Sequence, residues 1–117
     1  MIRSTEDDEV DLYISAIIHG NEVIGLYLIN EILECIYNKK FKLKINLLIS
    51  LGNINAFLLQ KRFVIKDMNR LFMTSKKSKN ELKIPEEHRA WDLEHMILSL
   101  PKPPRAIFDI HQTAALS

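Results

Sequence analysis

The sequence contains little cysteine, glycine or proline. Among 117 residues there are one cysteine, three glycines and four prolines. A single cysteine excludes an internal disulfide, and Cys35, which lies among apolar residues, is expected in the core. All-β proteins need turn residues at every strand junction, so the shortage of glycine and proline favours long helices.

Membrane spans and export signals are also lacking. The most apolar stretch, residues 23–37, is interrupted by Asn30, Glu31 and Glu34. It falls short of the roughly 20 apolar residues that cross a bilayer. Acidic residues at positions 6–9 are the wrong chemistry for a signal peptide. We therefore expect no membrane span and a cytoplasmic or otherwise intracellular location.

The composition is that of a folded globular domain, with 47% hydrophobic and 26% charged residues. Apolar residues recur at three- and four-residue spacing, which predicts helices at about residues 6–18, 21–37 and 85–100. Asn53 and Asp67 are expected to cap two shorter helices. The expected fold class is all-α: a compact helical bundle or paired helical hairpins of five to six helices over residues 1–100. An extended, proline-containing segment follows over residues 101–117.

Two parts of this interpretation stay open. Residues 41–47 alternate apolar and polar side chains as a strand does, but the alternation breaks at residues 47–49, and we predict helix there. A Gly-Asn pair follows an apolar run at Gly20 and again at Gly52, 32 residues later. Both pairs are interpreted as helix ends, belonging either to a helical repeat or to two ordinary hairpins.

One helical face carries metal-ligating side chains. His88, Asp92 and His95 share a face of the helix predicted at residues 85–100, and their groups are ligands for zinc or iron. Three ligands on one helix seldom close a tetrahedral site, however, and no HExxH or paired CxxC accompanies them. We therefore expect neither a metal nor another cofactor. Because no GxSxG, Walker or dinucleotide motif is present either, the sequence predicts a protein that is not an enzyme.

Charge is segregated along the chain. Residues 1–34 hold eight acidic residues and one basic residue, whereas residues 35–83 hold twelve basic and two acidic residues. The basic segment 39–83 either faces the acidic N-terminal part or binds nucleic acid or another polyanion. The polyanion candidates are Lys39, Lys40, Lys42 and Lys44.

The C-terminal segment combines prolines with apolar side chains that fit an interface. The candidate partner-binding residues are Trp91, Arg105, Ile107, Phe108 and Ile110. The leading hypothesis is a non-enzymatic protein–protein interaction module, an adaptor or a subunit of a larger complex, that binds a protein partner or a second copy of itself. The alternative is nucleic-acid or polyanion binding through segment 39–83. A weaker alternative is a small viral or bacterial effector with a Bcl-2-like helical bundle.

Overall fold

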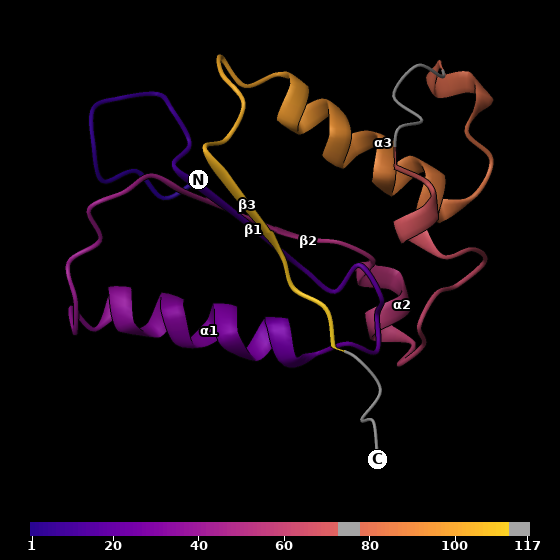
Figure 1. The fold of residues 1–117 in the computed structure, drawn as a ribbon. Helices are drawn as coiled ribbons and strands as arrows, with labels where there is room; N and C mark the ends of the chain where they lie inside the picture. Colours follow the sequence, from indigo (N-terminus) through magenta and orange to yellow (C-terminus); the bar gives the residue numbers. More distant parts are fainter. Residues whose placement is uncertain (73–77, 113–117) are drawn as a thin grey trace.

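A parallel sheet lies between two helices in the computed structural model, which describes residues 1–72 and 78–112. The strands are β1 (Leu12–Ala16), β2 (Leu47–Leu51) and β3 (Ala106–Asp109), in the order β2-β1-β3. Helix α1 (Ile24–Tyr37) covers one face of the sheet, and α3 (Pro85–Leu98) covers the other (Figure 1). The described residues also include the short helix α2 (Ile54–Leu58) and the 3-10 turns η1 (Met68–Arg70) and η2 (Lys79–Glu81). The expected all-α bundle is therefore wrong, because the fold is mixed α/β.

The central strand explains this error. Tyr13 packs with Leu48 on the α3 side of the sheet, and Ile14 packs with Leu47 and with Ile29 of α1 on the other side. A parallel strand that is buried on both faces is apolar almost without interruption. In β1 this run imitates the apolar stripe of a helix, so the helix predicted at residues 6–18 is wrong.

The second strand corrects another prediction. Residues 47–51 pair in parallel with β1, from Leu12 opposite Leu47 to Ala16 opposite Leu51. The helix predicted there is therefore wrong. The alternation in residues 41–47 ends where β2 begins, so it does not mark the strand either.

Several local signals are confirmed. Helices α1 and α3 lie within the ranges predicted for them, and Pro85 opens α3. The Asn53 side chain accepts a hydrogen bond of 3.2 Å from the backbone N–H of Ala56 and caps α2. Asp67 caps η1 by accepting the N–H of Asn69 at 3.0 Å. These two caps and the start of α3 are therefore predicted correctly from the sequence, although the fold class is not.

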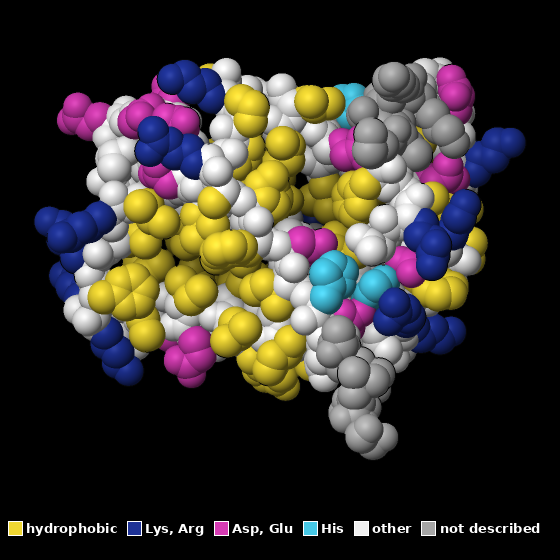
Figure 2. Space-filling model, in the orientation of Figure 1, with side chains coloured by type: hydrophobic (Ala, Val, Ile, Leu, Met, Phe, Trp, Pro, Cys, Tyr) yellow, Lys and Arg dark blue, Asp and Glu magenta, His cyan; other side chains and the backbone are white. Residues whose placement is uncertain are grey.

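Helix α1 is not the buried centre of the molecule. Only Gly25 and Ile29 are fully buried in it, and Cys35 is half-buried. Its exposed apolar side chains are Ile24, Tyr27, Leu28, Leu33 and Tyr37. Hydrophobic side chains cover a wide area of the face shown in Figure 2. Even so, no helix among the described residues is long and apolar enough to cross a bilayer.

The described part of the C-terminal segment joins the sheet. Ala106 lies opposite Leu12, and the pairing runs to Asp109 opposite Ser15. All four residues of β3 are exposed, since the strand lies at an edge of the sheet. Residues 113–117, the last part of the predicted extended segment, lie outside the described residues.

Candidate metal centre

The carboxyl ends of β1 and β3 lie side by side, and polar residues follow both strands. The chain passes from β1 through α1 to β2 on one side of β1, and returns through α3 to β3 on the other side. In open parallel sheets, ligands bind beyond the carboxyl ends of the strands at such a reversal of strand order. His19 and Glu22 follow β1, and His111 follows β3.

The chain makes a tight turn on leaving β1. Ile17 is fully buried with a φ of 53°, a backbone conformation that costs free energy for a β-branched residue. Its carbonyl accepts the N–H of Asn53 at 2.8 Å, and this bond from the end of β2 holds the turn in place. The turn directs the chain toward α2, so that His19 lies at the end of the sheet.

Gly20 allows this loop to lie against α2. A Cβ at this position would lie 2.4 Å from backbone atoms of Ala56 and Phe57, closer than any side chain can approach. The Gly20 N–H donates to the Arg62 carbonyl at 3.0 Å. Glycine is therefore required here for space, and the loop is fixed by backbone contacts on two sides.

His19, Glu22 and His111 converge. Nδ1 of His19 contacts Oε2 of Glu22, and Nδ1 of His111 lies 3.3 Å from Oε1 of the same carboxylate. One nitrogen or oxygen atom from each residue falls within 4.8 Å of the others. His19 and Glu22 are buried, whereas His111 lies at the surface. Figure 2 shows histidine side chains beside acidic and basic ones next to the apolar area.

An aspartate holds each histidine from behind. Nε2 of His19 lies 2.9 Å from Oδ1 of Asp67, and Nε2 of His111 lies 2.8 Å from Oδ2 of Asp109. A carboxylate only accepts hydrogen bonds, so Nε2 of each ring is the nitrogen that donates to the aspartate, and Nδ1 of each ring is the nitrogen that faces Glu22. Metal-ligating histidines are oriented in the same way by a carboxylate on the second ring nitrogen.

This donor set fits zinc. Two imidazole nitrogens and one glutamate oxygen are a ligand set of catalytic zinc sites, which keep a further coordination position open for water or substrate. Two of the three residues are buried, and an aspartate contacts the second ring nitrogen of both imidazoles. The same residue types also suit other divalent transition metals.

The surroundings keep the carboxylates charged. Burial raises the pKa of Glu22, but the backbone N–H of Gln112, at 2.6 Å, and the two histidines outweigh it and lower that pKa below the usual glutamate value. The Arg62 guanidinium also contacts Glu22 at 3.3 Å. Burial likewise raises the pKa of Asp67, but the N–H of Asn69 and the His19 ring outweigh burial and lower that pKa below the usual aspartate value. Both carboxylates are therefore ionised at neutral pH and ready to face a cation.

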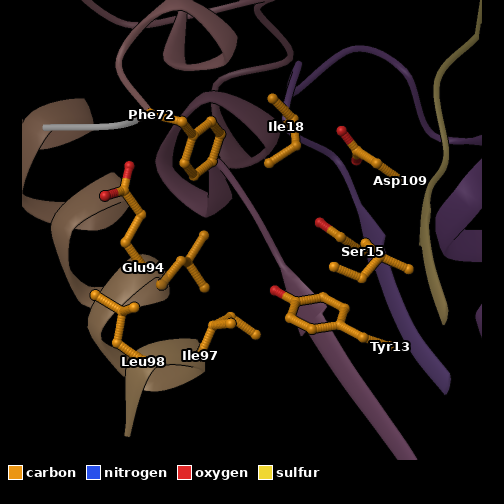
Figure 3. Close-up of a pocket in the computed structure, with 10 residues that line it drawn as sticks. Tyr13, Ser15, Ile18, Phe72, Glu94, Ile97, Leu98 and Asp109 are labelled. Carbon is orange, nitrogen blue, oxygen red and sulfur yellow. The ribbon is translucent and has the colours of Figure 1, made fainter. Parts of the chain in front are cut away.

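An apolar hollow of about 400 Å³ lies between β1 and α3 (Figure 3). Tyr13 and Ser15 of β1 line one side, and Ile97 and Leu98 of α3 line the other. Asp109, which supports His111, lines the same hollow, so the hollow adjoins the support of the metal centre.

The histidines singled out in the sequence analysis lie elsewhere. His88 is exposed on α3, and His95 pairs through Nδ1 with the carbonyl of Trp91 at 2.9 Å. Trp91 stacks on the His95 ring with a centroid separation of 3.6 Å. The described residues do not bring His88, Asp92 and His95 together as a ligand cluster.

The candidate partner-binding residues differ in their contacts and exposure. Arg105 is ion-paired with Glu9 at 3.2 Å, within the chain. Ile107 and Phe108 are 58% and 60% exposed on β3. Ile110 is half-buried and packs against Gly25. The polyanion candidates Lys39, Lys40, Lys42 and Lys44 are all exposed, in the connection from α1 to β2.

The sequence analysis missed all three residues of the metal centre. His19 lies just after the helix predicted at residues 6–18, so it was taken as part of a helix end. His19 and Glu22 follow one apolar run, and His111 follows another run that contains Asp109. The usable signal was this repetition: metal-ligating side chains placed just after two strand-length apolar runs.

Known proteins are similar to this chain in sequence and fold. The family model for the succinylglutamate desuccinylase/aspartoacylase catalytic domain matches residues 8–117. The chain is 36% identical over 111 residues to a succinylglutamate desuccinylase of Pseudomonas putida, covering 92% of this chain and 32% of that protein. The crystal structure of the succinylglutamate desuccinylase of Chromobacterium violaceum superposes with a TM-score of 0.76 at 28% identity, covering 89% of this chain and 34% of that one. Murine aminoacylase 3 shares the fold, with a TM-score of 0.69 at 19% identity over 92% of this chain and 36% of that one.

The chain spans about a third of the length of these relatives. A catalytic-domain model that matches nearly the whole chain contradicts the expected non-enzymatic adaptor, together with its polyanion-binding and Bcl-2-like alternatives. The physical reason for the error is that the metal ligands come from two distant segments, which only the parallel sheet brings together.

Proposed function

This chain belongs to the succinylglutamate desuccinylase/aspartoacylase family, and we propose that it is the metal-binding part of a hydrolase that cleaves the amide bond of an N-acylated amino acid. The observation that carries the proposal is the convergence of His19, Glu22 and His111, with Asp67 and Asp109 holding the two rings. Curated relatives at 31–36% identity are named succinylglutamate desuccinylase, which supports a hydrolytic reaction.

The chemistry requires an electrophilic carbonyl and an acidified water. A zinc ion held by His19, Glu22 and His111 would supply both, by polarising the amide carbonyl and lowering the pKa of water. In the reaction the acyl carbon gains the oxygen of water, the carbon–nitrogen bond breaks, and the amine leaves with a proton. Asp67 and Asp109 would fix the orientation of the two imidazoles by accepting a hydrogen bond from the second ring nitrogen of each.

The charges beside the centre favour an anionic substrate. The side chains of Arg62 and Arg70 are 51% and 80% exposed, and each lies beside a carboxylate of the site: Arg62 beside Glu22, and Arg70 beside Asp67 at 3.9 Å. An exposed guanidinium binds a carboxylate with two parallel hydrogen bonds. We propose that one or both arginines bind a carboxylate of an N-acylated acidic amino acid, such as N-succinylglutamate.

Zinc binding and hydrolysis test this proposal. The chain should bind one zinc ion, and the protein that contains it should release glutamate from N-succinylglutamate in a reaction that chelator stops. Glu22→Gln should weaken zinc binding by at least tenfold, whereas Glu31→Gln, the same change at an exposed position of α1, should leave it unchanged. Absence of zinc binding by the unaltered chain would contradict the proposal.

Two further expectations stay proposals. The single cysteine is consistent with an intracellular location. The exposed Ile107 and Phe108 are consistent with a protein partner or a second copy of the chain at β3. Sedimentation of the chain with and without Phe108→Lys would test self-association there.

A further inference from the structure

The irregular segment 62–67 reaches the metal centre at three points. The Arg62 carbonyl accepts the N–H of Gly20, and the Arg62 guanidinium contacts Glu22. Asp67 holds Nε2 of His19. The segment has no helix or strand of its own over residues 59–67. Its position must therefore come from bonds to other elements.

A buried carboxylate on α3 supplies those bonds. Glu86, the second residue of α3, is 1% exposed. Its carboxylate accepts the backbone N–H groups of Val64, Ile65 and Lys66 at 2.8, 3.1 and 3.3 Å. It also accepts the side-chain amide of Asn53 at 2.9 Å. Four donors match the roughly four lone-pair positions of one carboxylate, and bonds to a charged acceptor are the stronger kind.

The same carboxylate is linked to the turn after β1. Asn53, which donates to Glu86 through its side chain, donates through its backbone N–H to the carbonyl of Ile17. Glu86 therefore binds two elements that position His19. One is the segment that carries Asp67, and the other is Asn53, which is bonded to the turn after β1. No bond joins Glu86 to the metal ligands themselves among the contacts of the described residues.

We propose that Glu86 is a positioning residue for the metal centre, which sets Asp67 and Arg62 through the three backbone N–H groups of residues 64–66. The proposal rests on the proposed function, because it requires that His19, Glu22 and His111 bind a metal. If Glu86 only stabilised the fold, its loss would lower the free energy of unfolding and leave the zinc affinity of the folded protein unchanged.

Glu86→Gln is the discriminating variant. Glutamine has nearly the same shape, but its –NH2 group cannot accept a hydrogen bond, so it opposes at least one backbone N–H that the carboxylate accepted. We expect the zinc dissociation constant, measured by competition with a chromophoric chelator, to rise about tenfold or more, the scale of losing an outer support of a ligand. The matched control is Glu87→Gln, the same change one residue along. Glu87 accepts the N–H of Lys83, outside segment 62–67, so zinc affinity should change less than about twofold in that variant.

A double-mutant cycle shows whether Glu86 acts through Asp67. Asp67→Asn alone should weaken zinc binding, and adding Glu86→Gln should weaken it little further, since the two changes remove the same support. If the two substitutions instead raised the zinc dissociation constant by factors that multiply in the double variant, Glu86 would not act through Asp67. An unchanged zinc affinity in folded Glu86→Gln would overturn the positioning role itself. If the unaltered chain binds no zinc, the proposed function fails, and this proposal fails with it.

Hydrogen exchange of the unaltered protein covers the case in which Glu86→Gln does not fold. If the segment and the metal centre are coupled, zinc must slow exchange of the Val64 and Ile65 amides, because linkage is reciprocal. The Lys83 amide, which bonds to Glu87, should not respond. Equal exchange at Val64 and Ile65 with and without zinc would overturn the proposal.

Discussion

Gly20→Ala should disrupt the metal centre through a backbone clash. The new Cβ would lie 2.4 Å from backbone atoms of Ala56 and Phe57 and 2.5 Å from the Lys61 carbonyl oxygen. Since these neighbours are backbone atoms rather than flexible side-chain ends, relief requires that the loop and α2 move apart by about 1 Å. That movement breaks the bond from the Gly20 N–H to the Arg62 carbonyl and shifts His19 relative to Asp67.

The expected cost follows from two contributions. Overpacking a tight site costs about 1–3 kcal/mol, and the lost buried hydrogen bond adds about 1 kcal/mol. The free energy of unfolding should therefore fall by roughly 2–4 kcal/mol in a denaturant titration, and the zinc dissociation constant should rise by more than about tenfold. Asn21→Ala, at the exposed neighbouring position, is the control and should change neither quantity appreciably. A fall in the free energy of unfolding of less than about 0.5 kcal/mol for Gly20→Ala would mean that the loop does not lie against α2.

Three further predictions concern stability. Asn46 is fully buried, and its side chain makes five hydrogen bonds to residues 4–9, so Asn46→Leu should lower the free energy of unfolding by about 2–4 kcal/mol in urea titrations; a neutral result would mean that this segment does not pack on β2. Leu47→Ala should lower the free energy of unfolding by about 2–5 kcal/mol, whereas Leu33→Ala on the exposed side of α1 should lower it by less than about 1 kcal/mol. The reverse order would mean that Leu33 is more deeply buried than Leu47. Burial raises the pKa of Glu86, but the donors from Asn53 and segment 64–66 lower it below the ordinary 4.5. Glu86 therefore stabilises the fold above pH 4.5, and this contribution is lost as the pH falls through the pKa of the folded state. The free energy of unfolding should fall more steeply below pH 4.5 in the unaltered chain than in Glu86→Gln, and parallel curves would contradict this.

Local sequence signals predicted α1, α3 and the caps at Asn53 and Asp67, but not the sheet. Asn53, Asp67 and Pro85 were placed correctly because a cap depends on residues within one turn. Strand β1 was assigned to a helix because Tyr13 and Ile14 face opposite covered sides of the sheet, a pattern that periodicity cannot distinguish from a buried helix. The pairing of β3 with β1 joins residues more than 90 positions apart, which no local pattern encodes.

The Gly-Asn pairs show the same limit from another side. Both were interpreted as helix ends, but both follow the parallel strands β1 and β2, where the chain leaves the sheet. Gly20 and Gly52 are each needed for space, since a Cβ would meet backbone at Gly20 and Ile18 at Gly52. The signal was real, and its cause was close packing beyond the strand ends rather than a helical repeat.

For a related reason, the spacing of residues along the sequence could not predict the metal centre. His88, Asp92 and His95 attracted attention because they share one helical face, yet the converging ligands come from loops after two different strands. His19 and His111 meet only because β1 and β3 are neighbours in the sheet. A sequence-based prediction of the ligands therefore needs the order of the strands in the sheet.

Zinc titration of the unaltered chain, His111→Ala and His88→Ala shows whether His19, Glu22 and His111 form a metal site. Each variant removes one imidazole from an exposed position, and only His111 belongs to the cluster. We expect the unaltered chain and His88→Ala to bind one zinc ion, and the zinc dissociation constant of His111→Ala to be at least tenfold higher. Equal zinc affinity in the two variants, or no binding by the unaltered chain, would contradict this metal site.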